Sequence, residues 1–168
     1  MRRWWGIVAL LASVGLIGGC AVSADSRLDE FRAEGEAISQ QVVESIPAAV
    51  IADEAPDSAS AGRLAQSMGD TPQTPAWWEV KTSVVMLDEP AASETAATAI
   101  ETALVDDGWK KAEESGSPDP VYKTDEYRRD GWYVRVAWVR STPKTIESLR
   151  VLVVSPDTIR GDHDEIHS

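Results

Sequence analysis

The only two histidines of the chain lie near its C-terminus, in a run rich in carboxylates. His163 and His167 are four residues apart, so a helix would place both imidazoles on one face beside Asp162 and Asp164. That arrangement could bind a divalent metal. A short tail has no core to hold ligands in a fixed geometry, however, and so we expect no metal site. Residues 157–168 are predicted to be a solvated polar tail.

The residues that catalysis requires are missing from the rest of the sequence. A Ser–His–acid triad needs a histidine held in a structured cleft, which neither histidine has. No glycine-rich phosphate loop, dinucleotide-binding fingerprint or HExxH motif is present. Neighbouring carboxylates fall where solvation and helix capping explain them: Asp53/Glu54, Asp88/Glu89 and Asp106/Asp107. We therefore expect a protein that is not an enzyme and that carries no cofactor.

Arginine and aromatic side chains gather around the Asp130-Gly131 turn. In the strand expected after this turn, alternate residues from Trp132 to Trp138 would cover the core, and those between them would face outward. Surfaces that combine aromatic rings with guanidinium groups contact protein partners or anionic groups. The candidate binding residues are Arg128, Arg129, Tyr133 and Arg135.

The single cysteine of the chain ends a hydrophobic N-terminal segment. Arg2 and Arg3 precede an uncharged run of 16 residues, from Trp4 to Gly19, and Cys20 follows directly. A helix of that length, at about 1.5 Å per residue, falls short of the roughly 30 Å hydrocarbon core of a bilayer. A basic region followed by a short apolar region is the pattern of a secretory signal peptide. Residues 1–19 are therefore predicted to be a cleaved signal peptide.

The sequence Ile17-Gly18-Gly19-Cys20 resembles the lipobox of bacterial lipoproteins, and the resemblance covers only the first 20 residues. It implies transfer of a diacylglyceryl group to the Cys20 thiol and cleavage before Cys20. The mature protein would then be held in the cell membrane, on its extracytoplasmic face. Whether export uses the general secretory or the twin-arginine route stays open. The composition is similar to that of small lipoproteins of high-GC Gram-positive bacteria.

The charge of the chain is strongly acidic and unevenly distributed. There are 16 Lys plus Arg and 28 Asp plus Glu. Removing residues 1–19 takes away two Arg and no acid, so the mature chain has a net charge of −14. Residues 110–150 are the only basic part of it, with nine basic and seven acidic side chains. Because nucleic-acid binding needs clustered surplus cations, we expect no nucleic-acid partner.

The N-terminal half of the mature chain divides into three predicted segments. Apolar residues at helical spacing, from Leu28 to Ile46, predict an amphipathic helix over residues 26–47, ended by Pro47. Its polar face is acidic, whereas helices that lie on membranes are usually rich in Lys and Arg, so we expect it to dock on the protein's own sheet. Residues 20–25 would then be a short lipid-anchored tether. Residues 48–76, rich in Ala, Ser, Asp, Pro and Gly, are predicted to be a linker with at most a short helical turn around Ala61–Met68.

Residues 77–156 are predicted to form the sheet domain. A strand with alternating apolar residues precedes an Ala-rich helix that Gly108 ends, and three or four meandering strands follow. This order predicts an α+β fold: a two-layer sandwich with an antiparallel sheet of about four to five strands and helices on one face.

The sequence thus predicts a lipid-anchored envelope protein whose non-catalytic domain serves protein interaction or scaffolding. The alternative is binding of a small ligand or an anionic envelope polymer through the Arg and aromatic sheet face.

Overall fold

The computed structural model describes residues 25–65, 71–89, 91–112, 122–139, 148–163 and 166. The predicted signal peptide 1–19, Cys20 and the tether up to residue 24 lie outside the described residues, and so does His167.

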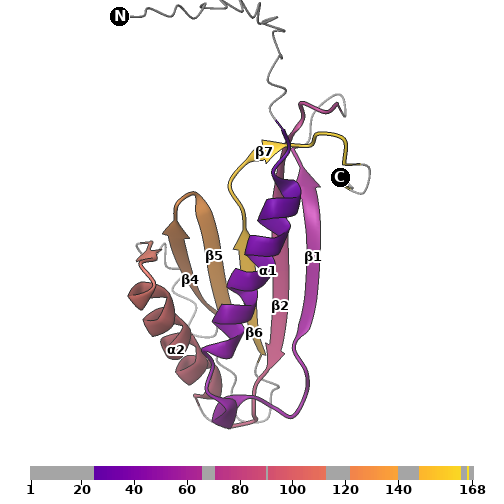
Figure 1. Ribbon diagram of the computed structural model, residues 1–168. Coiled ribbons are helices and arrows are strands. Elements are labelled where there is room, and N and C mark those ends of the chain that lie inside the picture. The colour runs from indigo at the N-terminus through magenta and orange to yellow at the C-terminus, as the bar shows by residue number, and fades with distance from the viewer. Residues whose placement is uncertain are drawn as a thin grey trace, which may run out of the picture.

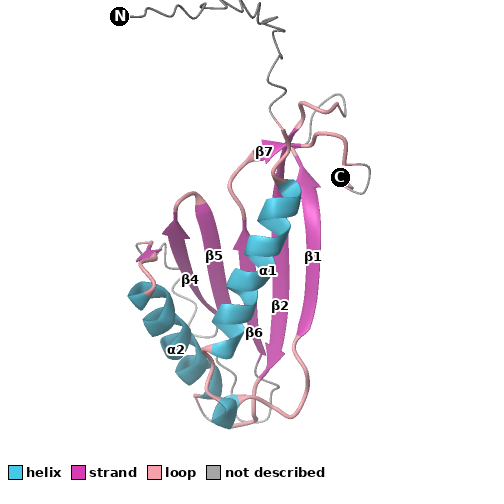
Figure 2. Ribbon diagram, viewed as in Figure 1, coloured by secondary structure: helices cyan, strands magenta, loops and turns pink. Residues whose placement is uncertain are grey.

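Two helices lie on one face of a seven-stranded sheet, as Figures 1 and 2 show. The helices are α1 (Leu28–Glu44) and α2 (Ala92–Asp106), and a short 3-10 helix spans Ala48–Val50. The strands are β1 (Asp57–Leu64), β2 (Pro75–Val85), β3 (Lys110–Lys111), β4 (Tyr122–Arg129), β5 (Trp132–Val139), β6 (Ser148–Val154) and β7 (Thr158–Ile159). The prediction of an α+β fold is confirmed, but the sheet has more strands than the four to five expected.

The strand order is β1-β2-β6-β5-β4-β3, and β7 pairs with the start of β2. All described strand pairs are antiparallel. The last long strand of the chain, β6, therefore lies in the centre of the sheet between β2 and β5. This topology brings residues that are far apart in the sequence, on β4, β5 and β6, to one part of the sheet surface.

Helix α1 docks on the sheet, as predicted from its acidic polar face. The predicted apolar stripe, from Leu28 and Phe31 to Ile46, is buried. The helix packs chiefly on β2 and β6, and the ring of Phe31 meets that of Trp132 edge to face, with centroids 5.7 Å apart. Aromatic pairs in this geometry stabilise a fold by more than their buried area alone.

Helix α2 ends at Asp106, two residues before the glycine that the sequence indicated as its stop. Gly108 has a φ of +85°, a left-handed conformation that glycine adopts without strain. The chain then folds back, so that the backbone N–H of Trp109 donates to the carbonyl of Leu104 at 2.9 Å. The Trp109 side chain is buried in the core.

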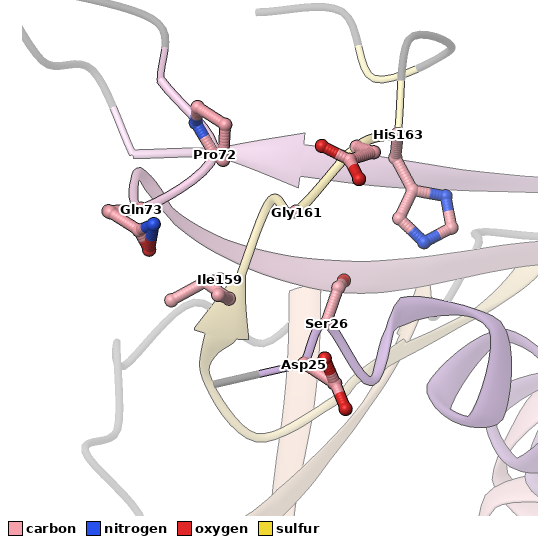
Figure 3. Close-up of a pocket in the computed structure, with 8 residues that line it drawn as sticks. Asp25, Ser26, Pro72, Gln73, Ile159, Gly161 and His163 are labelled. Atoms are coloured by element: carbon pink, nitrogen blue, oxygen red, sulfur yellow. The ribbon is translucent and has the colours of Figure 1, made fainter. Parts of the chain in front are cut away.

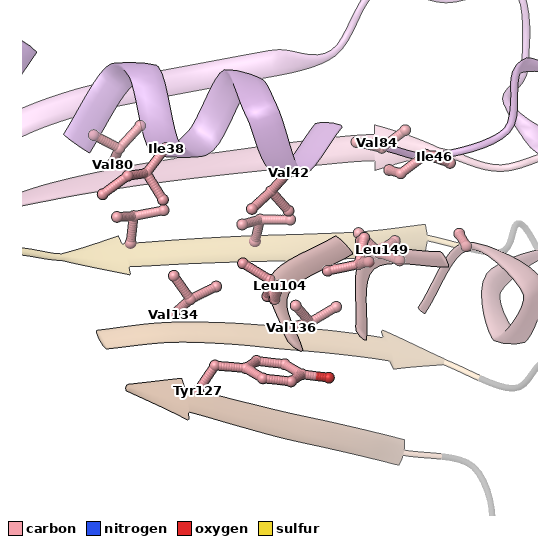
Figure 4. Packing of buried hydrophobic residues seen from close by; sticks show 14 of the residues in the cluster. Ile38, Val42, Ile46, Val80, Val84, Leu104, Tyr127, Val134, Val136 and Leu149 are labelled. Atoms are coloured by element: carbon pink, nitrogen blue, oxygen red, sulfur yellow. The ribbon is translucent and has the colours of Figure 1, made fainter. Parts of the chain in front are cut away.

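The core lies between the helices and the sheet (Figure 4). Alternate residues of the central strands point into it, including Val80 and Val84 of β2, Leu149 of β6, and Val134 and Val136 of β5. Within the helices that the structure describes, none is long and apolar enough to cross a bilayer.

The prediction that residues 48–76 form a linker is wrong for residues 57–64, which form β1 and pair with β2 over eight residues. The helical turn expected around Ala61–Met68 is wrong for the same reason, because its first residues belong to this strand. β1 is attached to the rest of the fold by hydroxyl groups, not by apolar side chains. Ser58 Oγ lies 2.9 Å from Thr82 Oγ1, which lies 2.8 Å from Ser39 Oγ of α1.

The prediction of a solvated polar tail is wrong for part of residues 157–168. Thr158 and Ile159 form β7, and Ile166 is buried against Leu28 and Ala76. A single apolar residue in an otherwise polar run thus joins the C-terminal segment to the start of α1.

Candidate binding face

Within the described residues, one face of the sheet carries no helix. Alternation along the strands determines which side chains this face presents. Cross-strand partners share a face, and Val80, Val84 and their partners point toward the helices. The opposite set forms the surface that we call the open face. Its charged members are Asp57 and Arg63 on β1, Glu79 and Lys81 on β2, Lys110 on β3, Glu126 and Arg128 on β4, Arg135 on β5, and Arg150 on β6.

The open face has more cations than carboxylates, in contrast to the chain as a whole. It carries six basic and three acidic side chains, although the chain has a net charge of −12. The helical layer is acidic, since α2 contains three carboxylates and no basic residue. Charge is therefore segregated between the two sides of the molecule.

The cations near β1 are neutralised within the protein. Glu79 Oε2 lies 3.1 Å from Arg63 Nε and 3.0 Å from Lys81 Nζ, and Trp77 Nε1 donates to Glu79 Oε1 at 3.3 Å. Burial alone would raise the pKa of Glu79, but the hydrogen bonds from Lys81, Trp77 and Arg63 outweigh it, so that the pKa is lowered. Glu79 therefore stays ionised, and this part of the open face is close to neutral.

The cations over β3 to β6 have no such partner in the part of the chain that the structure describes. Within the described residues, no carboxylate lies within 4 Å of the charged groups of Lys110, Arg128, Arg135 or Arg150. Lys110 and Arg128 are moreover direct cross-strand partners. Because like charges opposite each other destabilise a sheet, this pairing favours an anion between them.

Tyr133 lies beside these cations on the open face, opposite Arg128 and next to the turn between β4 and β5. The guanidinium of Arg128 lies 5.1 Å from the centre of the Tyr133 ring, within the range of a cation–π contact. Burial, followed by a hydrogen bond to Glu126, raises the pKa of Tyr133 to about 12. The phenol therefore stays protonated well into the alkaline range, and its hydroxyl bonds the Glu126 carboxylate.

A hollow of about 320 Å³ adjoins the open face at the turn between β4 and β5. Lys110, Arg128 and Arg129 line it together with the Asp130-Gly131 turn. Asp130 and Gly131 both have positive φ, as the tight hairpin requires. The hollow is large enough for one anionic group and is open to solvent.

Three of the four predicted binding residues lie together, and the fourth does not. Arg128, Tyr133 and Arg135 are on the open face, whereas Arg129 points to the other side. Its guanidinium donates to the carbonyl of Asp107 at 2.8 Å, also pairs with the Asp107 carboxylate, and lies 4.7 Å from the centre of the Trp109 ring. Arg129 therefore fastens β4 to the end of α2.

Lys110 and Arg150 are not among the four predicted binding residues, yet they lie on the open face. Both belong to the open face only because of strand register: Lys110 lies opposite Arg128, and Arg150 lies opposite Ala137. Alternation within β6, where Leu149, Val151 and Val153 are buried, was the available signal that Arg150 points outward.

A second hollow, of about 410 Å³, lies where the chain enters α1 (Figure 3). Asp25, Ser26 and His163 are among its lining residues. Gly161 packs against Ser26 so closely that a Cβ would lie 2.7 Å from Ser26 Cβ. His163 Nε2 is 3.9 Å from Asp29 Oδ2, and the described residues contain no cluster of three or more potential metal ligands.

The comparisons with known proteins give no relative: no family model, curated protein or solved structure matches the chain.

Proposed function

We propose that the mature chain is a lipid-anchored protein of the cell envelope whose open face binds an anionic envelope polymer. Diacylglyceryl-Cys20 holds it in the cell membrane, on the extracytoplasmic side. No catalytic step, cofactor or nucleic-acid partner is part of the proposal. The observation that carries it is a group of cations, Lys110, Arg128, Arg135 and Arg150, that have no carboxylate partner among the described residues of an acidic protein.

These cations lie on four different strands, β3 to β6, and so spread across the sheet instead of enclosing one point. A polymer with repeated negative charges can contact several of them at once. Arginine suits this role because its planar guanidinium group forms bidentate hydrogen bonds with phosphate and carboxylate oxygens. This arrangement favours a polymer over a single small ligand.

The polymer-binding proposal is tested with the full chain, purified from membranes in detergent. The probes are poly(glycerol phosphate) and polyglutamate, which present phosphate and carboxylate groups. We expect binding that weakens as salt is raised, because exposed charges are screened over about 8 Å at physiological ionic strength. Reversal of three cations, Arg128→Glu with Arg135→Glu and Arg150→Glu, should weaken the binding at least tenfold.

The matched control changes the net charge by the same amount away from the open face, with Arg27→Glu, Arg32→Glu and Lys123→Glu. All three residues are exposed: Arg27 directly precedes α1, Arg32 lies on α1, and Lys123 lies on the opposite face of β4. Arg27 and Arg32 form only solvent-exposed ion pairs, with Glu30 and Glu36, and such pairs contribute little to stability. Arg129 is left unchanged in both variants, because it is bound to Asp107. Equal losses in the two variants would show only an effect of total charge and would contradict the proposal, as would failure of the wild type to retain either polymer.

The anchor is tested by the intact mass of the protein extracted from membranes of its host. We expect a chain that begins at Cys20 and carries a diacylglyceryl group, with or without a further acyl chain. Cys20→Ser should move the protein from the membrane fraction to the medium. A mass that includes Met1, or an unchanged membrane fraction for the variant, would refute the lipid anchor.

A further inference from the structure

The two edges of the sheet differ in how well they are protected against pairing with another strand. At one edge, β3 has two residues, both lysines, and short lysine-rich edges discourage pairing. At the other edge, β1 has eight residues, and within the described residues it pairs only with β2. Its register with β2 runs from Asp57 to Leu64 without a bulge. β1 therefore presents a long, regular edge (Figure 1).

The pattern of hydrogen bonds shows which backbone groups of β1 point outward. Ala65 N donates to the carbonyl of Pro75 at 2.9 Å, and this bond continues the register of β1 with β2. In an antiparallel ladder, alternate residues bond to the same neighbour, so the odd-numbered residues of β1 bond to β2. On the other side of β2, Ser155 N donates to the carbonyl of Trp78. The even-numbered residues of β2 therefore form their backbone hydrogen bonds with β6, which leaves the odd-numbered ones to bond with β1. The outward N–H and C=O groups of β1 are therefore those of Ser58, Ser60 and Gly62.

The side chains along this edge are self-complementary for an antiparallel pair. When two copies of β1 meet with Ser60 opposite Ser60, the outward groups of Ser58 meet those of Gly62 in the other copy. In the same register Ala59 lies opposite Ala61, and Asp57 lies opposite Arg63 at both ends. Asp57, Ala59, Ala61 and Arg63 all belong to the open face, so the paired side chains lie on one side of the joined sheet.

We propose that the protein forms a homodimer in which the β1 strands of two copies pair antiparallel about a twofold axis at Ser60. Two ion pairs between Asp57 and Arg63 of different copies set the register. Shifting the register by two residues removes both ion pairs, and a shift by one residue would place the side chains on opposite faces. The small residues between the charges let the two strands approach without steric conflict. The two sheets then form one continuous sheet, and the two open faces lie side by side.

We expect the strand that pairs with the β1 edge to come from a second copy of the protein, because the charges at the two ends of β1 have opposite signs. An isologous contact brings each end of the strand to the opposite end of its partner, and here that places acid against base twice. Arg63 also pairs with Glu79 within its own chain, at 3.1 Å, which fixes its guanidinium over the open face near the edge.

The register is tested by cysteine cross-linking of the full chain in its own membrane. Ala59→Cys and Ala61→Cys proteins carrying different tags are produced separately and together. We expect a disulfide-linked dimer only when both are present, because residue 59 of one copy lies opposite residue 61 of the other. Such opposed residues have Cβ atoms about 4.5–5.5 Å apart, close to the separation in a disulfide. The wild type, which has only Cys20, is the control for background cross-linking.

Cross-linking of Ala59→Cys or of Ala61→Cys with itself would place the strands in another register and overturn the proposal. Absence of any cross-link beyond the wild-type level would overturn it as well.

Charge exchange supplies a second test, with the dimer dissociation constant measured by sedimentation in detergent. Asp57→Arg alone should raise this constant about tenfold or more, since it sets two cations against each other twice. The double variant Asp57→Arg with Arg63→Asp should recover most of the loss, because it restores both ion pairs in reversed order. Lys123→Asp, at the far side of the sheet, is the control and should leave dimerisation unchanged. A double variant no better than the single one would contradict the proposed register.

Blocking the edge gives a third readout that does not depend on charge. Ser60→Pro removes an N–H that points away from β2, and proline is tolerated at sheet edges. We expect Ser60→Pro to be monomeric, while Ser60→Ala, which also lacks the hydroxyl, stays dimeric. If both stay dimeric, the interface lies elsewhere. None of these measurements uses the polymer, so the dimer and the proposed function succeed or fail separately.

Discussion

The two faces of the sheet are built from the same strands but by different chemistry. On the face covered by helices, the side chains of the central strands β2, β5 and β6 are mostly apolar, and the buried hydroxyls of Ser39 and Thr82 bond to each other. On the open face, cations outnumber carboxylates, and four of them have no carboxylate partner within the described residues. The comparison indicates that the covered face supplies stability, whereas the open face is available for binding.

The largest effect should come from removing an aromatic residue on the covered face. Trp132→Ala deletes a buried ring that packs on Phe31, and should lower the free energy of unfolding by about 3–5 kcal/mol. Urea unfolding followed by circular dichroism measures the change. Tyr133→Ala, the neighbouring residue on the open face, is the matched control and should cost clearly less. Equal losses would mean that both faces contribute to the core.

A smaller loss of stability is expected from removing Lys111, which forms an ion cluster with Asp125 and Glu101 on the covered face. Lys111 Nζ lies 3.1 Å from Asp125 Oδ1 and 2.7 Å from Glu101 Oε2. Because Asp125 is largely buried, Lys111→Ala leaves its carboxylate uncompensated and should cost about 1–3 kcal/mol. Adding Asp125→Asn to this variant should recover part of the loss, as unfolding curves would show. No recovery would mean that the lysine acts through its contact with the Tyr127 ring, 5.9 Å away.

Alkaline pH should weaken the fold because it deprotonates two tyrosines, Tyr127 and Tyr133. Burial is the main cause that raises the pKa of Tyr133, from 10 to about 12, and it also raises that of Tyr127. A tyrosine with a raised pKa binds its proton more tightly in the folded state, so stability is complete below pH 10 and falls as the pH rises from 10 toward 12. Tyr133→Phe should reduce this fall between pH 9 and 11.5 in urea titrations. An unchanged pH dependence would contradict the shift at Tyr133.

The smallest effect is expected where the covered face contains an unsatisfied group. Tyr127 is fully buried, and its hydroxyl makes no hydrogen bond within the described residues (Figure 4). Since an unpaired buried hydroxyl is unfavourable, Tyr127→Phe should leave stability unchanged or raise it by up to about 1 kcal/mol. A loss above 1 kcal/mol, measured as for Trp132→Ala, would reveal a partner for this hydroxyl.

The elements that the sequence predicted well are those with an apolar period. The stripe from Leu28 to Ile46 and the alternation from Trp132 to Trp138 each gave the element and the buried face. β1 has no such pattern: its helix-side positions include Ser58, Ser60 and Gly62, and its stability comes from pairing with β2 and from hydroxyl bonds to distant residues. Contacts of this kind depend on the assembled fold, so the strand looked like a linker.

The candidate site was predictable along a strand but not across strands. Alternation alone places Tyr133 and Arg135 on the same face, and it also separates Arg128 from its neighbour Arg129. Placing Lys110 and Arg150 beside them requires knowledge of which strands are neighbours and of the register between them, and this depends on the assembled sheet.

The position of α1 has a mechanical consequence for an anchored protein. The helix lies along β2 and β6 and begins at the end of the molecule where the proposed tether enters (Figure 1). A pull along the helix axis would load its whole row of buried contacts, from Leu28 to Ile46, in shear, so that they must break together and not one after another. Resistance to such a force depends on the unfolding rate more than on equilibrium stability. In the proposed anchored protein, the docked helix would thus transmit force between the bilayer and a ligand bound to the sheet without unfolding first.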